Sequence, residues 1–182
     1  MRTPLIAGNW KMHKTVAEAT DLVRDLRTQL EQTPSAAEVA VCPPFTALQA
    51  VGEALQGSAI AWGAQQMHSE PSGAYTGEIA APMLVELGCT YVIIGHSERR
   101  QYFGETNEGV NRKVLAALEH GLRPIVCVGE SLDQRESDRT RPVVEEQVRQ
   151  GLDGLNEQQW GRVVIAYEPV WAIGTGLTAT PQ

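Results

Sequence analysis

Four predicted strands of this 182-residue chain are each followed by side chains that can transfer protons or bind anions. Asn9 and Lys11 follow the first strand, and His96, Glu130 and Glu168 follow the fourth, fifth and sixth strands. The carboxyl ends of parallel strands lie on one edge of a sheet, where α/β proteins build their active sites. A lysine, a histidine and a carboxylate gathered there can bind an anion, polarise a carbonyl group and move a proton. Each residue taken alone is more often structural or solvated, so the prediction of acid–base chemistry depends on their convergence.

The residues around Glu168 form the longest continuous signal. Residues 163–166 are apolar, which is typical of a buried parallel strand, and Pro169 ends that strand directly after the acid. The loop that follows is apolar, contains Trp171 and ends in Gly-Thr-Gly. Such a loop either packs on a neighbouring helix or closes over a ligand as a lid, and the pattern alone leaves both interpretations open.

Strand and helix signals alternate along the chain and supply the elements that must position these residues. Short apolar runs predict strands at residues 5–10, 39–42, 59–63, 91–94, 125–128 and 163–166. Apolar residues at helical spacing predict helices at 16–30, 46–55, 80–87, 107–120 and 144–155. Residues 132–141 mix both signs of charge and indicate a solvated loop with a short helix. This order predicts parallel βαβ units with right-handed crossovers in one α/β domain.

Composition limits the classes of function. The chain is 42% hydrophobic and 20% charged, with a net charge of -7, so it can bury a globular core and is a poor ligand for nucleic acids or anionic membranes. Cys42, Cys89 and Cys127 show no paired spacing, which indicates free thiols in a reducing compartment. We see no signal-peptide core and no apolar run long enough for a membrane span. The expectation is therefore a soluble cytoplasmic protein.

Motifs for metals and nucleotides are incomplete. His96-Ser97-Glu98 has the H-x-E form of a zinc deaminase, but the chain has no Cys-x-x-Cys pair. Gly174-x-Gly176 imitates the start of a dinucleotide fingerprint, but proline interrupts the preceding strand and the required acid does not follow. The chain has no Walker sequence, and its other histidines lack metal-ligand spacing. We expect neither a metal nor another cofactor.

Four segments together resemble the triosephosphate isomerase family. They are Asn9-Trp10-Lys11, residues 91–100 (YVIIGHSERR), residues 127–130 (CVGE) and residues 167–176 (YEPVWAIGTG). The match extends in order along all 182 residues. The resemblance implies a (β/α)8 TIM barrel, of which six β/α units are visible here. It also implies a glycolytic and gluconeogenic isomerase that interconverts dihydroxyacetone phosphate and glyceraldehyde 3-phosphate through an enediolate.

The resemblance implies a role for each matching residue. Glu168 corresponds to the base that moves a proton between adjacent carbons, and His96 to the donor that stabilises the enediolate oxygen. Lys11 corresponds to the cation that meets the substrate, Asn9 orients the same oxygens, and the amide of Gly174 reaches the phosphate. The supporting positions are Glu98, Cys127 and Glu130, of which the last two are equally explained by packing and lid anchoring. The lid comprises Pro169, Val170, Trp171, Ala172, Ile173, Gly174, Thr175 and Gly176.

Other positions bear on assembly. The loop around Thr76 corresponds to the family's interdigitating loop, which implies a homodimer. Gln66 stands where asparagine is common, so a dimer contact near Lys11 is expected to differ. Leu177 replaces the common lysine of the second lid hinge.

The end of the sequence leaves a second function open. Six strands do not close a parallel barrel of eight, and Thr180-Pro181 resembles a helix start. We therefore expect residues 1–182 to be a single TIM-barrel domain truncated before the seventh strand, without the phosphate-binding loops that follow. The alternative function is a catalytically incompetent fragment that acts only in assembly. The hypothesis of an aldolase of the same fold is weaker. Such an enzyme needs a Schiff-base lysine inside a strand, and none of the six strand cores contains a lysine.

Overall fold

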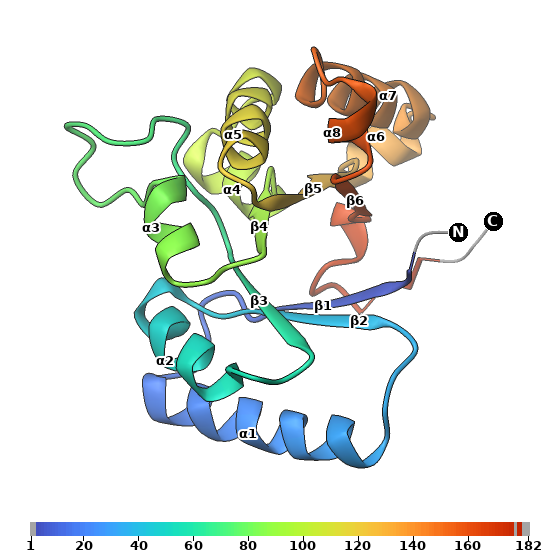
Figure 1. Cartoon of the computed structure of the whole chain (residues 1–182). Helices are drawn as coiled ribbons and strands as arrows, with labels where there is room; N and C mark the ends of the chain where they lie inside the picture. Colours follow the sequence, from blue (N-terminus) through green and yellow to red (C-terminus); the bar gives the residue numbers. More distant parts are fainter. Residues whose placement is uncertain (1–2, 177, 180–182) are drawn as a thin grey trace.

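The computed structural model describes residues 3–176 and 178–179, so the expected helix start at Thr180 and the substitution at Leu177 lie outside the described residues. Six strands form one parallel sheet in the order of the sequence. They are β1 (Leu5–Asn9), β2 (Glu38–Cys42), β3 (Ile60–Ala64), β4 (Tyr91–Ile94), β5 (Arg123–Val128) and β6 (Val164–Tyr167). Within the described residues β1 and β6 are not paired, so the sheet is an open portion of a barrel (Figure 1). The predicted α/β class and parallel order are confirmed.

Helices follow the strands on the outer side of the sheet (Figure 1). They are α1 (Val16–Gln32), α2 (Phe45–Leu55), α3 (Ala81–Glu86), α4 (Ser97–Phe103), α5 (Asn107–Glu119), α6 (Leu132–Glu136), α7 (Thr140–Gly151), α8 (Glu157–Trp160) and the 3-10 turn η1 (Val170–Ala172). No helix in this described part of the chain is long and apolar enough to cross a membrane.

Two short helices are absent from the predicted set, and one predicted helix has different bounds. The residues of α4 are mostly polar, and α8 is a single turn, so neither presents an apolar period. A capping box between Asn156 and Gln159 opens α8 and is a signal that the sequence carries. The predicted helix at 144–155 is wrong at both ends, because α7 begins at Thr140 and ends at Gly151.

Different parts of β3 pair with its two neighbouring strands. Ala61 and Trp62 pair with β2, whereas Gly63 and Ala64 pair with β4. A Cβ atom on Gly63 would lie 2.3 Å from the carbonyl oxygen of Tyr91, so only glycine permits this close approach of the two strands.

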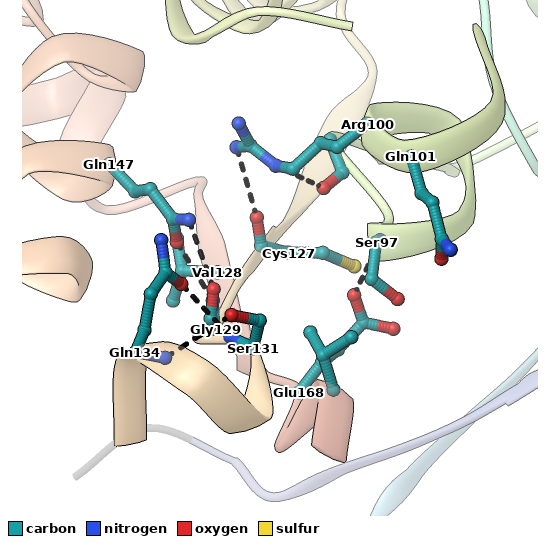
Figure 2. A pocket seen from close by; sticks show the side chains of 12 residues that line it. Ser97, Arg100, Gln101, Cys127, Val128, Gly129, Ser131, Gln134, Gln147 and Glu168 are labelled. Carbon is teal, nitrogen blue, oxygen red and sulfur yellow. Dashed lines mark hydrogen bonds between the residues drawn. The ribbon is translucent and has the colours of Figure 1, made fainter. Parts of the chain in front are cut away.

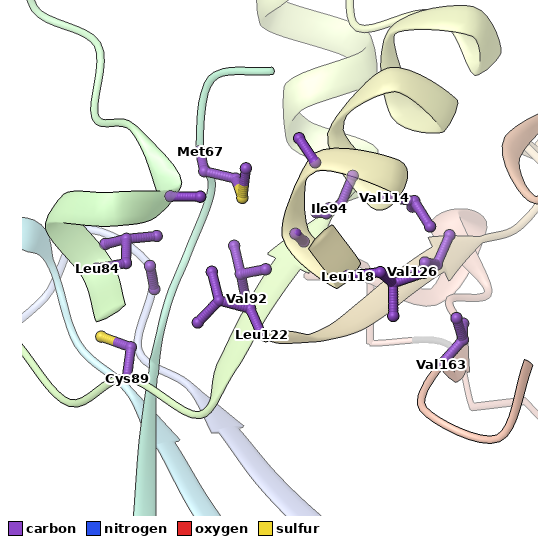
Figure 3. Packing of buried hydrophobic residues seen from close by; sticks show 14 of the residues in the cluster. Met67, Leu84, Cys89, Val92, Ile94, Val114, Leu118, Leu122, Val126 and Val163 are labelled. Atoms are coloured by element: carbon purple, nitrogen blue, oxygen red, sulfur yellow. The ribbon is translucent and has the colours of Figure 1, made fainter. Parts of the chain in front are cut away.

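Alternate strand residues pack on the two sides of the sheet. The inner layer contains Cys42, Tyr91, Ile93, Ile125 and Cys127. On the outer side, residues of α3, α5 and their connections cover β4 and β5 (Figure 3). The members labelled there are Met67, Leu84, Cys89, Val92, Ile94, Val114, Leu118, Leu122, Val126 and Val163. These two layers fix the strand ends that carry the site.

The three cysteines are buried free thiols. Burial raises the pKa of the Cys42 and Cys89 thiols to about 12, and burial also raises the pKa of Cys127. The expected absence of a disulfide framework therefore agrees with the structure, and all three side chains are protonated at neutral pH.

Candidate active site

Glu168 and His96 meet at the carboxyl ends of β6 and β4. Nε2 of His96 lies 2.7 Å from Oε1 of Glu168, and the two side chains are 8% and 16% exposed. The other carboxylate oxygen accepts a hydrogen bond from the backbone N–H of Ser97 at 2.9 Å. The carboxylate is therefore held between two donors from the first turn of α4, which are distant from it in sequence.

The two ring nitrogens of His96 bond to different groups. Nδ1 accepts a hydrogen bond from the backbone N–H of Glu98 at 3.2 Å, and His96 is thereby the N-cap of α4. This pattern assigns the ring proton to Nε2, which donates to Glu168. A fixed imidazole N–H at this place suits an oxygen that gains negative charge during a reaction.

Opposing effects set the pKa of Glu168. Burial by itself raises the pKa, but hydrogen bonds from His96 and from the Ser97 N–H lower it further than burial raises it. The thiol of Cys127 also forms a hydrogen bond with this carboxyl group. The net pKa is below the ordinary value, so Glu168 is ionised at neutral pH, as a base must be.

Lys11 lies in the loop after β1 and reaches the same region through Glu98. Its Nζ is 2.9 Å from Oε1 of Glu98, and Oε2 of Glu98 is 3.6 Å from Nδ1 of His96. The backbone of Lys11 has a φ of 52°, and its N–H donates to the side chain of Asn9 at 3.0 Å. The carbonyl oxygen of Lys11 accepts from Gln65 at 2.9 Å, so hydrogen bonds fix both backbone polar groups of the residue that presents the cation.

Within the chain, Gln66 contacts the base of the long loop and α5, while the expected change in a dimer contact near Lys11 stays a prediction. Its amide donates to Glu78 at 2.9 Å and accepts from Lys113 at 3.3 Å. It therefore joins the base of the long loop to α5, and the neighbouring Gln65 supplies the contact with Lys11. Glutamine is long enough to make these contacts, but the sequence alone does not show which partners each glutamine has.

Glu130 anchors the segment that the sequence suggests is a lid. Its carboxylate is fully buried and accepts hydrogen bonds from the Tyr167 hydroxyl at 2.9 and 3.0 Å and from Nε1 of Trp171 at 3.0 Å. The guanidinium of Arg135 lies 4.3 Å from the Trp171 ring centroid. Burial alone raises the pKa of Glu130, but the hydrogen bond from Tyr167 and its other donors outweigh burial and leave the pKa lowered. Of its two proposed roles, lid anchoring is the one that these contacts support.

A cavity of about 450 Å³ lies beside Glu168 (Figure 2). It is lined by Gly95, Ser97, Arg100, Gln101, Cys127, Val128, Gly129, Ser131, Gln134, Gln147, Glu168 and Val170. Asn9, Lys11 and His96 do not line it, so the cavity adjoins the other side of the Glu168 carboxylate.

Arg100 and Gln147 are among the polar residues of this cavity that sequence reasoning did not select. Arg100 donates to the Gly95 carbonyl at 2.7 Å and to that of Cys127 at 3.4 Å. Gln147 bonds twice to Gly129. Arg100 belongs to the segment 91–100 that carries the family resemblance, whereas nothing in the sequence distinguishes Gln147 from other helical glutamines.

The parallel order of the strands and the position of the site at their carboxyl ends place the chain among TIM-barrel enzymes. The family model described as triosephosphate isomerase matches residues 4–182. The chain belongs to the triosephosphate isomerase family.

Individual relatives agree with this assignment. The triosephosphate isomerase of Chloroflexus aurantiacus is 61% identical over 181 residues, which are 100% of this chain and 72% of that protein. That of Caldanaerobacter subterraneus is 59% identical over 182 residues, which are 100% of this chain and 73% of that protein. The crystal structure of the Bartonella henselae enzyme superposes with a TM-score of 0.86 at 40% identity, covering 93% of this chain and 69% of that chain.

Proposed function

We propose that this protein is a triosephosphate isomerase that interconverts dihydroxyacetone phosphate and glyceraldehyde 3-phosphate, a step of glycolysis and gluconeogenesis. The observation that carries the proposal is the contact between ionised Glu168 and the Nε2–H of His96. Isomerisation between an aldose and a ketose needs a base for a carbon-bound proton and a donor for the neighbouring oxygen. These two side chains supply both groups within one hydrogen bond of each other.

The proposed proton path uses Glu168 in both directions. The carboxylate removes a proton from the carbon beside the carbonyl group, and the electron pair moves to form an enediolate. His96 donates the hydrogen bond from Nε2 to the oxygen where negative charge develops. The hydroxyl proton of the enediolate passes to the former carbonyl oxygen, directly or through Nε2 of His96, so that the other oxygen becomes the new carbonyl oxygen. The proton carried by Glu168 returns to the adjacent carbon, which regenerates the carboxylate and completes the exchange. A positioned base contributes about 10²–10⁴-fold to the rate, and one oxyanion donor about 10²–10³-fold.

Lys11 and Asn9 are proposed to bind the anionic substrate, and the amide of Gly174 is proposed to contact its phosphate. The Lys11 side chain is 35% exposed and its ammonium is paired only with a partly exposed carboxylate in the contacts described above, which leaves it accessible to a second anion. A local cation is needed because the chain carries a net charge of -7.

The lid, from Pro169 to Gly176, is proposed to close over bound substrate. Its current anchor is Glu130, which Trp171 and Tyr167 contact. Closure would exclude water from the enediolate and prevent loss of its phosphate group. Exchange of the Glu130 hydrogen bonds for contacts with substrate would drive the motion.

A homodimer is proposed through the loop around Thr76. This loop projects from the body of the protein between β3 and α3 (Figure 1). Phe103 is 69% exposed and lines a surface hollow together with His68 and Glu78 of this loop. The adjacent Tyr102 is also 69% exposed, and Met12 in the loop after β1 is 94% exposed. Exposed apolar side chains of this size are typical of a surface that a protein partner covers.

The remaining proposals concern organisation and location. We propose that residues 1–182 belong to a single domain, since all six strands join one continuous sheet. Three protonated free thiols support a reducing compartment such as the cytoplasm. The alternative of an inactive assembly fragment is not favoured by relatives that are themselves named triosephosphate isomerase.

The purified protein should isomerise triose phosphate in an assay coupled to a dehydrogenase. Glu168→Gln keeps the shape of the side chain but removes the base, so activity should fall at least about a hundredfold. Glu136→Gln makes the same change at an exposed position and should have no effect. Equal activity of the protein and of its Glu168→Gln variant would contradict the proposed function.

A further inference from the structure

We propose that Gln147 is a positioning residue for Glu168, an inference that rests on the proposed role of Glu168 as the base. Gln147 lies on α7, and its carboxamide makes two hydrogen bonds with one residue (Figure 2). Its Oε1 accepts from the backbone N–H of Gly129 at 2.8 Å, and its Nε2 donates to the carbonyl oxygen of Gly129 at 3.0 Å. The side chain thus bonds to Gly129 as a neighbouring strand would.

The backbone of Gly129 is in direct contact with that of Glu168. The N–H of Glu168 donates to the carbonyl oxygen of Val128 at 2.7 Å, one residue before Gly129. A Cβ atom built on Gly129 would lie 1.8 Å from the carbonyl oxygen of Glu168. The two backbone segments are therefore in contact, with no space between them for a side chain. A displacement of Gly129 must therefore displace the backbone that carries the base.

The β5–β6 ladder holds Gly129 only through the preceding Val128 carbonyl oxygen, and it uses neither the N–H nor the carbonyl group of Gly129 itself. The paired register of β5 and β6 ends at Val128 and Tyr167, one residue before both Gly129 and Glu168. The cavity of about 450 Å³ borders Gly129, Gln147 and Glu168, so close packing does not restrain this side of the backbone. The two hydrogen bonds from Gln147 restrain the N–H and carbonyl group of Gly129 that the ladder leaves unpaired.

The geometry of the carboxylate makes this restraint important for catalysis. Oε1 and Oε2 of Glu168 bond to Nε2 of His96 and to the Ser97 N–H, both of which belong to a different strand connection. A small shift of the Glu168 backbone weakens both bonds together. A misplacement of about 1 Å in a catalytic group can cost about 10²-fold in rate.

Two substitutions separate a positioning role from a general contribution to stability. Gln147→Leu keeps a similar volume and removes both hydrogen bonds. Gln147→Glu retains an acceptor for the Gly129 N–H, but its ionised carboxylate repels the Gly129 carbonyl oxygen. When that new carboxyl group is protonated it can donate and accept, as the amide does. Gln158→Glu is the matched control, because Gln158 is exposed on α8 and lies outside the site.

The test is a titration of the Glu168 carboxyl group by carbon NMR, together with kcat and KM, in the protein and the three variants. In Gln147→Leu the pKa of Glu168 should rise toward its ordinary value and kcat should fall about tenfold, with KM changed less than about twofold. At each pH, the kcat of Gln147→Glu should approach that of the unchanged protein while the new carboxyl group is protonated, and it should fall to that of Gln147→Leu once the group is ionised. Gln158→Glu should resemble the unchanged protein throughout.

An unchanged Glu168 pKa in folded Gln147→Leu would overturn the inference, as would pH-independent behaviour of Gln147→Glu relative to the unchanged protein. If Gln147→Leu does not fold, the comparison of Gln147→Glu at low and high pH decides the question. Absence of isomerase activity in the unchanged protein would refute the proposed function instead, and the NMR titration would still report whether Gln147 positions Glu168.

Discussion

Nε2 of His96 donates a hydrogen bond to Oε1 of Glu168 across 2.7 Å. The candidate oxyanion donor and the candidate base thus form a hydrogen bond with each other. In the proposed reaction, contacts with substrate atoms replace this bond. The Ser97 N–H holds the second carboxylate oxygen at 2.9 Å, so the base remains ionised and oriented at neutral pH.

Removal of the His96 donor should raise the pKa of Glu168. Because the folded-state pKa is lowered, Glu168 contributes stability above its unfolded pKa, and this contribution is lost as the pH falls through the folded pKa. In His96→Leu the stability lost on acidification should be smaller, and the loss should be complete at a higher pH, because the folded-state pKa lies closer to the unfolded one. Urea unfolding between about pH 3 and pH 7 measures this change. His120→Leu, which changes the histidine at the C-cap of α5, should leave the acid dependence unaltered.

Loss of the Lys11 charge should weaken substrate binding. Lys11→Met removes the ammonium that bonds to Glu98 and is proposed to meet the substrate, so KM should rise about tenfold or more. Steady-state kinetics at two ionic strengths measures the change, and the dependence on salt should be weaker in the variant. Lys14→Met changes an exposed lysine of the same loop and should keep the original KM. An equal effect of both variants would show that only the general charge of the loop matters.

Removal of the Tyr167 hydroxyl should release part of the lid anchor. Tyr167→Phe leaves the buried Glu130 carboxylate without its closest donor, so the pKa of Glu130 should rise and unfolding should become easier by about 1–3 kcal/mol. The fluorescence of Trp171, which bonds to the same carboxylate, should change with it. Tyr102→Phe removes an exposed hydroxyl and serves as the control. Identical stability and fluorescence in both variants would contradict anchoring by Glu130.

Substitution at the exposed face near α4 should prevent dimer formation. Phe103→Glu places a charge on a side chain that is 69% exposed and lies in the proposed interface. Sedimentation velocity should show a dimer for the unchanged protein and a monomer for the variant. Leu22→Glu makes the same kind of change on α1, away from that face, and should remain dimeric. A monomer for the unchanged protein at high concentration would exclude the proposed homodimer.

The order of strands and helices was predictable from the sequence, because apolar residues recur differently in buried strands and in helices. The predicted strand at 91–94 coincides with β4, and β2 differs from the predicted run only by the addition of Glu38. The helix α4 was not predicted, since its N-cap is the ring of His96, which is not among the usual capping side chains, and its residues are mainly polar. Tertiary contacts, and not a local period, define that helix.

The site was predictable as a set of residues but not as a set of contacts. Glu168 and His96 follow strands whose carboxyl ends must share an edge, so their proximity follows from topology. The hydrogen bond from Ser97 to Glu168 and those from Gln147 to Gly129 depend on side-chain reach and backbone placement. Such details arise only when the strands are packed, which is why Gln147 escaped detection and Gln65, not Gln66, supports Lys11.

Transfer of a carbon-bound proton by Glu168 is tested most directly by isomerisation of dihydroxyacetone phosphate in D₂O. The unchanged protein should form glyceraldehyde 3-phosphate that carries deuterium on the carbon beside the aldehyde, detected by proton NMR, and Glu168→Gln should form almost none. Deuterium incorporation at the same rate in both proteins would show that another group moves the proton and would contradict the assignment of Glu168 as the base.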